Sequence, residues 1–152
     1  PQRILELGAG DGAVTIAALE RMHADSELVA LEVDEEFAAV LAERCPDARV
    51  VRADVADLGK VLGGLGEGPF DLVLSGLPTP SLPDTARAAM FDVLDAHASG
   101  APFSQLTVMP WVYQRFYRRY FADVTFRLVP MNLPPGGVYH CRGPRRRNGR
   151  AD

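Results

Sequence analysis

The segment from Ile4 to Gly12, Ile-Leu-Glu-Leu-Gly-Ala-Gly-Asp-Gly, limits what this 152-residue chain can fold into more than any other part of it. A short apolar run ends in alternate glycines, and the following stretch, Ala13–Met22, has a helical pattern. Glycine accepts positive φ and lets a ligand lie directly against the backbone. The segment therefore predicts a strand, a tight turn and a helix, with N–H groups of the turn facing a nucleotide-like small molecule.

Strand and helix patterns alternate along the rest of the chain. Expected strands cover Arg3–Leu7, Leu28–Glu32, Arg49–Arg52, Phe70–Leu74, Phe103–Met109, Val124–Val129 and Gly137–Arg142. Expected helices cover Ala13–Met22, Glu35–Arg44, Val55–Leu62, Asp84–Ala98 and Val112–Phe121. This alternation predicts an α/β fold with a Rossmann-like, seven-stranded, mostly parallel sheet and helices on both faces. The last two strands have no helix between them, so we expect a hairpin that leaves one antiparallel strand near the C-terminus.

The length suits a single compact domain, which we place at residues 1–143, followed by a basic and disordered tail at 144–152. No apolar run is long enough to span a membrane. Because the first residue is Pro1 rather than Met, we expect a further N-terminal segment before it. Cys45 and Cys141 lie far apart, without the spacing of metal ligands, and we expect two buried thiols, with a disulfide as the alternative.

Charge is unevenly distributed along the chain, whose formal net charge is −4. Residues 1–110 carry 7 Lys and Arg against 18 Asp and Glu, whereas residues 111–152 carry 9 Arg against 2 Asp. Such a basic block predicts an anionic partner, either a nucleic acid or a lipid surface. The alternative for the tail is a solvated segment without a partner.

Acidic residues stand at the ends of the first three expected strands, where ligands of open parallel sheets bind. Glu6 belongs to the first strand, Glu32 ends the second and Asp54 follows the third. A carboxylate in the position of Glu32 can accept hydrogen bonds from both hydroxyls of a ribose. Asp54 can accept one from the exocyclic amine of a purine.

This arrangement resembles the class I S-adenosylmethionine-dependent methyltransferases over nearly the whole chain. The glycine pattern is G-x-G-x-G, at Gly8, Gly10 and Gly12, and not the G-x-G-x-x-G of nicotinamide binders. The resemblance implies S-adenosylmethionine as cofactor. It implies as cofactor-binding residues Glu6, Gly8, Ala9, Gly10, Gly12, Glu32, Val33, Asp54, Val55 and Ser75. The alternative is a plain Rossmann-type domain with incidental acids.

The loop after the fourth strand, Ser75-Gly76-Leu77-Pro78, lies where this family has its catalytic loop. Adenine methyltransferases, the ribosomal RNA adenine dimethylases among them, have an Asn and an aromatic residue here, because a base amine needs an acceptor and a stacking partner. Gly76 and Thr79 stand in those positions. We therefore expect an aliphatic amine as acceptor, with backbone carbonyls of residues 75–77 receiving its protons and Ser75, Gly76, Leu77 and Pro78 forming the catalytic loop.

The same loop, together with Gln105–Thr107, Asn132–Pro135 and Val138–Arg142, is similar to the bacterial phospholipid N-methyltransferases. That resemblance implies methyl transfer to the headgroup amine of a phosphatidylethanolamine-type phospholipid. Two enzyme alternatives are methylation of RNA adenine at N6 and of a small-molecule amine. An alternative of another class is a non-catalytic module that binds S-adenosylmethionine.

Aromatic residues alternate with arginines in the stretch Trp111–Phe121. This composition suits the interface of a lipid headgroup layer. We expect peripheral contact with an anionic membrane through Arg115, Arg118, Arg119 and the basic tail, and a location in the cytoplasm or at the membrane surface. The alternative is an ordinary amphipathic helix whose aromatic side chains pack on the sheet.

Overall fold

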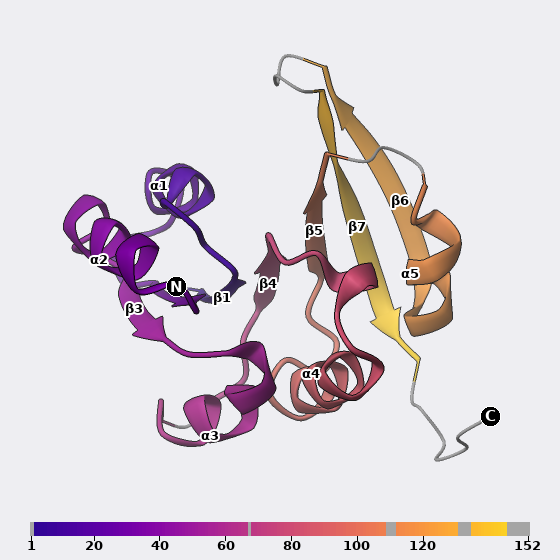
Figure 1. The fold of residues 1–152 in the computed structure, drawn as a ribbon, viewed down its shortest axis with the longest axis horizontal. Coiled ribbons are helices and arrows are strands. Elements are labelled where there is room, and N and C mark those ends of the chain that lie inside the picture. The colour runs from indigo at the N-terminus through magenta and orange to yellow at the C-terminus, as the bar shows by residue number, and fades with distance from the viewer. Residues whose placement is uncertain (1, 67, 109–111, 131–134, 146–152) are drawn as a thin grey trace.

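The computed structural model describes residues 2–66, 68–108, 112–130 and 135–145. They form a seven-stranded sheet of order β3-β2-β1-β4-β5-β7-β6 (Figure 1). The strands are β1 Arg3–Leu7, β2 Glu27–Glu32, β3 Arg49–Arg52, β4 Leu72–Ser75, β5 Phe103–Thr107, β6 Phe121–Val129 and β7 Gly136–Pro144. Strand β7 runs antiparallel to both of its neighbours, and the other pairs are parallel. The predicted fold class, with one antiparallel strand near the C-terminus, is therefore confirmed.

The helices follow the predicted order with small differences in length. They are α1 Ala13–Leu19, α2 Glu35–Arg44, α3 Leu58–Gly63, α4 Asp84–His97 and α5 Gln114–Tyr120, with short 3-10 turns η1 Val55–Asp57 and η2 Thr79–Ser81. The bounds of α2 match the prediction because the Asp34 side chain accepts a hydrogen bond from the Phe37 amide at 3.0 Å and caps its first turn.

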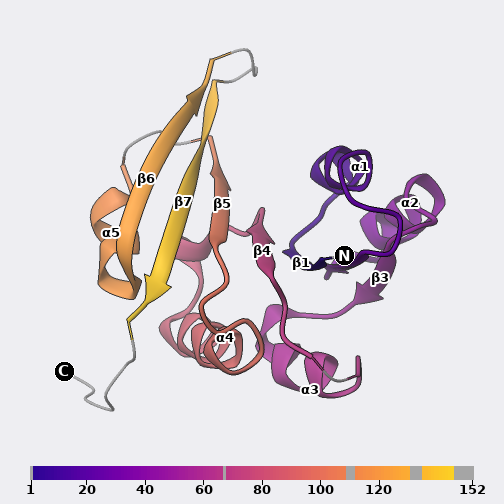
Figure 2. The same ribbon diagram turned by 180° about the vertical axis from the view of Figure 1, so that it is seen from behind.

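Helices cover both faces of the sheet, as predicted (Figures 1 and 2). Successive strand residues point to opposite faces. On one face, Ile4, Leu28 and Ala30 form a core with residues of α1 and α2. On the other, Leu5 and Phe103 belong to a larger core that includes residues of α3, α4 and α5. The sheet thus separates two apolar layers and leaves its carboxyl edge free for a site.

Helix α5 is shorter than the predicted Val112–Phe121, because it begins at Gln114 and Phe121 belongs to β6, and its aromatic residues contribute to the core. Tyr117 is 1% exposed, Tyr120 stacks on Phe91 with ring centroids 4.3 Å apart, and Phe121 already begins β6. The arginines of α5 remain exposed. The aromatic half of this amphipathic pattern therefore packs on the sheet. Trp111 lies outside the described residues.

The folded part extends past residue 143. Pro144 ends β7, the Arg145 amide donates to the Tyr120 carbonyl at 2.8 Å, and the Arg145 side chain donates to the Phe121 carbonyl at 3.1 Å. The domain thus includes two residues that we had expected in the tail, whose residues 146–152 lie outside the described part. Both cysteines are free and buried, as predicted. Within the described ranges, no helix has the length and apolar character needed to cross a membrane.

Candidate functional site

The glycine loop after β1 folds over the end of β2. Gly8, Gly10 and Gly12 have φ values of 68°, 57° and 89°. The amides of Gly8 and Ala9 donate to the Leu31 carbonyl at 2.9 and 3.1 Å, and the Gly10 amide donates to Glu32 Oε2 at 2.7 Å. Contrary to our expectation, the amides of Gly8, Ala9 and Gly10 therefore donate to β2 and not to a ligand. The loop offers a ligand its bare backbone surface.

Glu32 joins the loops that follow β1 and β2. Its side chain is almost buried, and Oε1 accepts hydrogen bonds from the amides of Val33 and Asp34 at 2.9 and 3.0 Å. With the bond from Gly10 to Oε2, three of the roughly four acceptor positions of a carboxylate are in use. One position on Oε2 remains for a hydroxyl group.

A first cavity, of about 410 Å³, opens at the carboxyl ends of the strands. Of the ten residues predicted to bind the cofactor, six line it: Gly8, Gly10, Glu32, Val33, Asp54 and Val55. Asp54 Oδ1 caps η1 by accepting from the Ala56 amide at 2.8 Å, and no described residue donates to its second oxygen. A Cβ on Gly10 would meet no atom within 4 Å, so this part of the loop faces open space.

The other four predicted residues lie around this cavity without lining it. Ala9 packs in the core beneath α1 and α2, and a Cβ on Gly12 would lie 2.7 Å from Leu41 Cδ1. Ser75 is fully buried, and its Oγ has no partner among the described residues. These residues therefore pack behind the loops that line the cavity.

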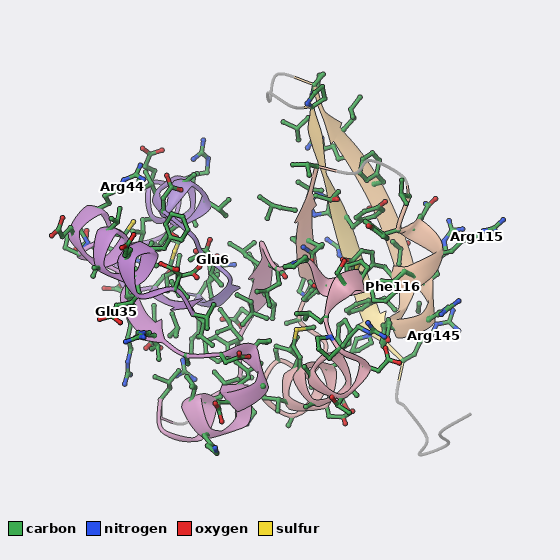
Figure 3. All side chains as sticks on the ribbon, viewed as in Figure 1. Glu6, Glu35, Arg44, Arg115, Phe116 and Arg145 are labelled. Atoms are coloured by element: carbon green, nitrogen blue, oxygen red, sulfur yellow. The ribbon has the colours of Figure 1, made fainter. Side chains whose placement is uncertain are left out.

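Glu6 is the fourth of these residues and lies on β1, with its side chain against Thr15 of α1 (Figure 3). Its side chain is 2% exposed and accepts a hydrogen bond from Thr15 Oγ1 at 2.7 Å. Burial raises the pKa of Glu6 to about 7, although the bond from Thr15 opposes this shift. Glu6 therefore changes charge in the neutral pH range, inside the core.

Phe37 is a cavity residue that we did not predict. It is half exposed and lines the first cavity from the first turn of α2. The sequence does contain a signal for it, because an aromatic residue stands in the first turn of the helix that follows the strand ending at Glu32. Leu7, Leu31, Ala53 and Leu82 also line this cavity.

The loop after β4 is in backbone contact with the loop after β1. The Gly76 amide donates to the Leu7 carbonyl at 2.8 Å. A Cβ on Gly76 would lie 2.5 Å from the Gly8 carbonyl oxygen, and a Cβ on Gly8 would lie 2.7 Å from Leu77 Cδ2. Real Cβ atoms do not approach other atoms this closely, so the chain has no room for the Asn of the adenine methyltransferases at position 76.

A second cavity, of about 530 Å³, lies on the other side of this loop. Gly76, Leu77 and Pro78 line both cavities. The remaining lining residues are apolar or uncharged: Pro80, Ser81, Gln105, Leu106, Thr107, Val108, Tyr113, Tyr117, Val129, Gly137 and Val138. The loop therefore separates a cavity with two carboxylates from one whose described lining carries no charge.

Gln105, in β5, holds the loop after β4 in place. It is 2% exposed, and its Nε2 donates to the carbonyls of Ser75 and Leu77 at 3.0 and 2.8 Å. Thr79 Oγ1 donates to Gln105 Oε1 at 2.7 Å, and the Thr79 amide donates to the Leu77 carbonyl at 2.8 Å. Of the three carbonyls expected to receive amine protons, only that of Gly76 has no donor among the described residues.

The sheet order, the glycine loop after β1, the acid at the end of β2 and the loop after β4 together define a class I S-adenosylmethionine-dependent methyltransferase. Residues 4–98 match the family model described as a methyltransferase domain, and the chain belongs to this family. The ornithine lipid N-methyltransferase of Singulisphaera acidiphila is 46% identical over 144 residues, which cover 92% of this chain and 75% of that relative.

Solved structures show the same fold. TrmN from Thermus thermophilus has a TM-score of 0.71 at 19% identity, over 93% of this chain. The chain spans only 44% of TrmN. Human methyltransferase-like protein 13, in complex with SAH, has a TM-score of 0.69 at 16% identity, over 94% of this chain and 72% of its own. S-adenosylmethionine is therefore the cofactor, and the carboxylates and open glycine backbone of the first cavity fit it.

Proposed function

We propose that this chain transfers a methyl group from S-adenosylmethionine to the amine nitrogen of a lipid headgroup. The observation that carries the proposal is the loop shared by the two cavities. The cavity on one side of it contains the carboxylates suited to the cofactor, and the described lining of the cavity on the other side is uncharged. A cofactor in the first cavity and an amine in the second would meet at Gly76, Leu77 and Pro78.

The cofactor supplies an electrophilic methyl group on a positively charged sulfur. The lone pair of the amine nitrogen would form the new bond to this carbon as the electrons of the carbon–sulfur bond go to sulfur, and the methylated nitrogen would lose its proton to bulk water when the product leaves the site. The contribution of the chain is to align the partners and exclude water. No strong base is needed, because desolvation in the second cavity lowers the pKa of an aliphatic ammonium group and favours its neutral, nucleophilic form.

The Gly76 carbonyl is the group we assign to orient the acceptor. It belongs to the shared loop, and no described residue donates a hydrogen bond to it. By accepting one N–H of the amine, it would direct the nitrogen lone pair toward the methyl group. The neighbouring carbonyls of Ser75 and Leu77 already accept hydrogen bonds from Gln105, which Thr79 holds in place.

Two features support an aliphatic amine over RNA adenine. Position 76 has no room for an Asn side chain, since a Cβ there would collide with Gly8. Thr79, in the position of the stacking aromatic, is fully buried and hydrogen-bonded to Gln105. A conjugated base amine would thus find neither a side-chain acceptor nor a stacking ring at these two positions.

Two headgroups fit this chemistry, because phosphatidylethanolamine and ornithine lipid both present an aliphatic primary amine. The sequence resemblance favours phosphatidylethanolamine. The 46% identical relative is named for ornithine lipid, and this level of identity over 92% of the chain makes ornithine lipid the acceptor that we place first.

The test is transfer of labelled methyl groups from S-adenosylmethionine to four acceptors presented separately: ornithine lipid, phosphatidylethanolamine, total RNA and a panel of small amines. We expect label in ornithine lipid, with phosphatidylethanolamine the second choice. Label in RNA or in small amines alone would overturn the lipid proposal. Tight cofactor binding without transfer to any acceptor would instead support a non-catalytic binding module.

A further inference from the structure

Large apolar side chains that are exposed concentrate at the edge of the sheet where the two cavities open. Three of the exposed ones in the described residues are Val108, Val112 and Leu128, with exposed fractions of 62%, 55% and 47%. Val108 lines the second cavity, and Val112 precedes Tyr113, which also lines it. We call these three residues the apolar edge. Exposed aliphatic side chains gathered beside a cavity mouth are a mark of an interaction surface.

The strand register places the apolar edge across the mouth of the second cavity. Thr107 pairs with Gly137, and Gly137 pairs with Leu128, so these residues form one row across β5, β7 and β6. Neighbouring strands lie about 4.8 Å apart, so Leu128 is only two strand spacings from the end of β5, where Val108 follows. Thr107 and Gly137, between them, line the second cavity.

Two exposed arginines flank the apolar edge from opposite faces of the sheet. Arg115 is in the first turn of α5 and points away from the sheet (Figure 3). Arg127 precedes Leu128 in β6 and therefore points to the other face, where its partner Val138 lines the second cavity. Neither arginine forms an ion pair with a described residue.

Building on the proposed function, we propose that the apolar edge inserts into the headgroup layer of a lipid bilayer while Arg115 and Arg127 contact lipid phosphates. Aliphatic side chains with flanking cations are stabilised at this interface, where an anionic or zwitterionic surface meets hydrocarbon. Docking in this direction places the mouth of the second cavity against the membrane, so that a headgroup amine reaches the loop at Gly76 without leaving the bilayer.

The charge distribution favours membrane contact at the apolar edge over contact beside the first cavity. The exposed Val33 and Phe37 lie beside the first cavity, but Asp34, Glu35 and Glu36 surround them and would be repelled by lipid phosphates. The proposal also differs from our expectation for α5 as a whole. The helix runs away from the carboxyl edge of the sheet (Figure 1), so Arg118 and Arg119 lie farther from the cavity mouth than Arg115.

The test combines vesicle binding with methyl transfer, using the chain with Val112→Ser and Leu128→Ser. Neither residue is among the described residues that line the first or the second cavity. The matched control is Val40→Ser, which replaces an exposed valine of α2. Binding is measured by sedimentation with vesicles of phosphatidylethanolamine and phosphatidylglycerol. Transfer is measured with ornithine lipid, the acceptor placed first, added to the same vesicles and, separately, as a short-chain form dispersed in detergent.

We expect the double variant to lose about tenfold or more in vesicle binding and in transfer to vesicle lipid, and to keep its transfer to dispersed lipid. Val40→Ser should match the unchanged chain in all three measurements. Arg115→Gln with Arg127→Gln should weaken vesicle binding by about tenfold at low salt and less at high salt.

Vesicle binding by the double variant equal to that of Val40→Ser would overturn the inference. It would also be overturned if the unchanged chain bound no vesicles and the double variant differed from it only in oligomeric state, since the apolar edge would then be a contact between copies of the chain. The proposed function fails separately. If the double variant loses vesicle binding but neither it nor the unchanged chain methylates dispersed lipid, the docking surface stands and the lipid acceptor is wrong. If dispersed lipid is methylated but vesicles are not bound at all, the acceptor stands and the surface is wrong.

Discussion

The backbone of Gly76 lies directly against the carbonyl oxygen of Gly8, with room for a hydrogen but not for a Cβ between them. This contact joins the loop after β1, which lines the first cavity, to the loop after β4, which lines both. On the proposed function, the distance between cofactor and acceptor would depend on these two glycines, which are remote in sequence.

Replacing Gly76 by Ala should weaken both stability and cofactor binding, because the new Cβ would lie 2.5 Å from a backbone oxygen that cannot move aside without the glycine loop. We expect a loss of about 1–3 kcal/mol in the free energy of unfolding and a cofactor affinity lower by about tenfold. Urea unfolding and calorimetric titration check this. Gly63→Ala is the control, since a Cβ there meets nothing within 4 Å. Equal behaviour of the two variants would show that the loops are not in close contact.

Asp54→Asn should separate capping from recognition of adenine. The Asn oxygen can still accept the hydrogen bond from the Ala56 amide, but its NH2 group cannot accept one from an adenine amine. We expect affinity for S-adenosylmethionine to fall by about 1.5–3 kcal/mol, the contribution of a hydrogen bond to a charged group. Affinity for an analogue without the adenine amine should barely change. Equal losses for both compounds would argue against this role of Asp54.

Thr79→Val should loosen the loop after β4, which we propose to be catalytic, while leaving the first cavity intact. The substitution keeps the shape of the side chain but leaves the buried Gln105 Oε1 without its donor, at a cost of about 1–3 kcal/mol. We expect kcat to fall by about tenfold with the cofactor Kd within twofold of its original value. Thr79→Ser retains the hydroxyl and should restore kcat. A parallel rise in the cofactor Kd, or identical kinetics of the two variants, would contradict the positioning role.

Glu6→Gln should stabilise the protein at high pH. Because the folded-state pKa of Glu6 is raised from 4.5 to about 7, the folded chain holds this proton more tightly than the unfolded chain does. Its favourable contribution is complete below pH 4.5 and is lost as the pH rises through about 7. Gln keeps the oxygen that accepts from Thr15 but does not ionise.

Urea unfolding should therefore show the Glu6→Gln variant more stable by up to about 3 kcal/mol near pH 8 and by less than about 1 kcal/mol near pH 5. Glu20→Gln, at an exposed position of the surface, is the control and should alter neither value by more than about 0.5 kcal/mol. A stability difference for Glu6→Gln that is the same at both pH values would mean that Glu6 does not titrate in the folded protein between them.

Much of the fold could be predicted because it rests on local signals. The bounds of β1, α2 and β3 were predicted to the residue, and in α2 the reason is a cap, Asp34, that belongs to the same segment as the helix. The helix α5 was predicted too long because pattern alone could not tell that Phe121 packs in the core as the first residue of β6.

The sequence by itself determined where the glycine turn lies, which strands carry carboxylates at their ends and that the loop after β4 lacks an Asn and an aromatic residue. These are properties of short segments, set by backbone freedom and by the alternation of side chains along a strand. Only the tertiary structure decided what those groups touch. The amides of Gly8, Ala9 and Gly10 donate to β2, Gln105 donates to two carbonyls of the loop after β4, and Gly76 lies against Gly8. Each of these contacts joins segments that only the folded sheet brings together.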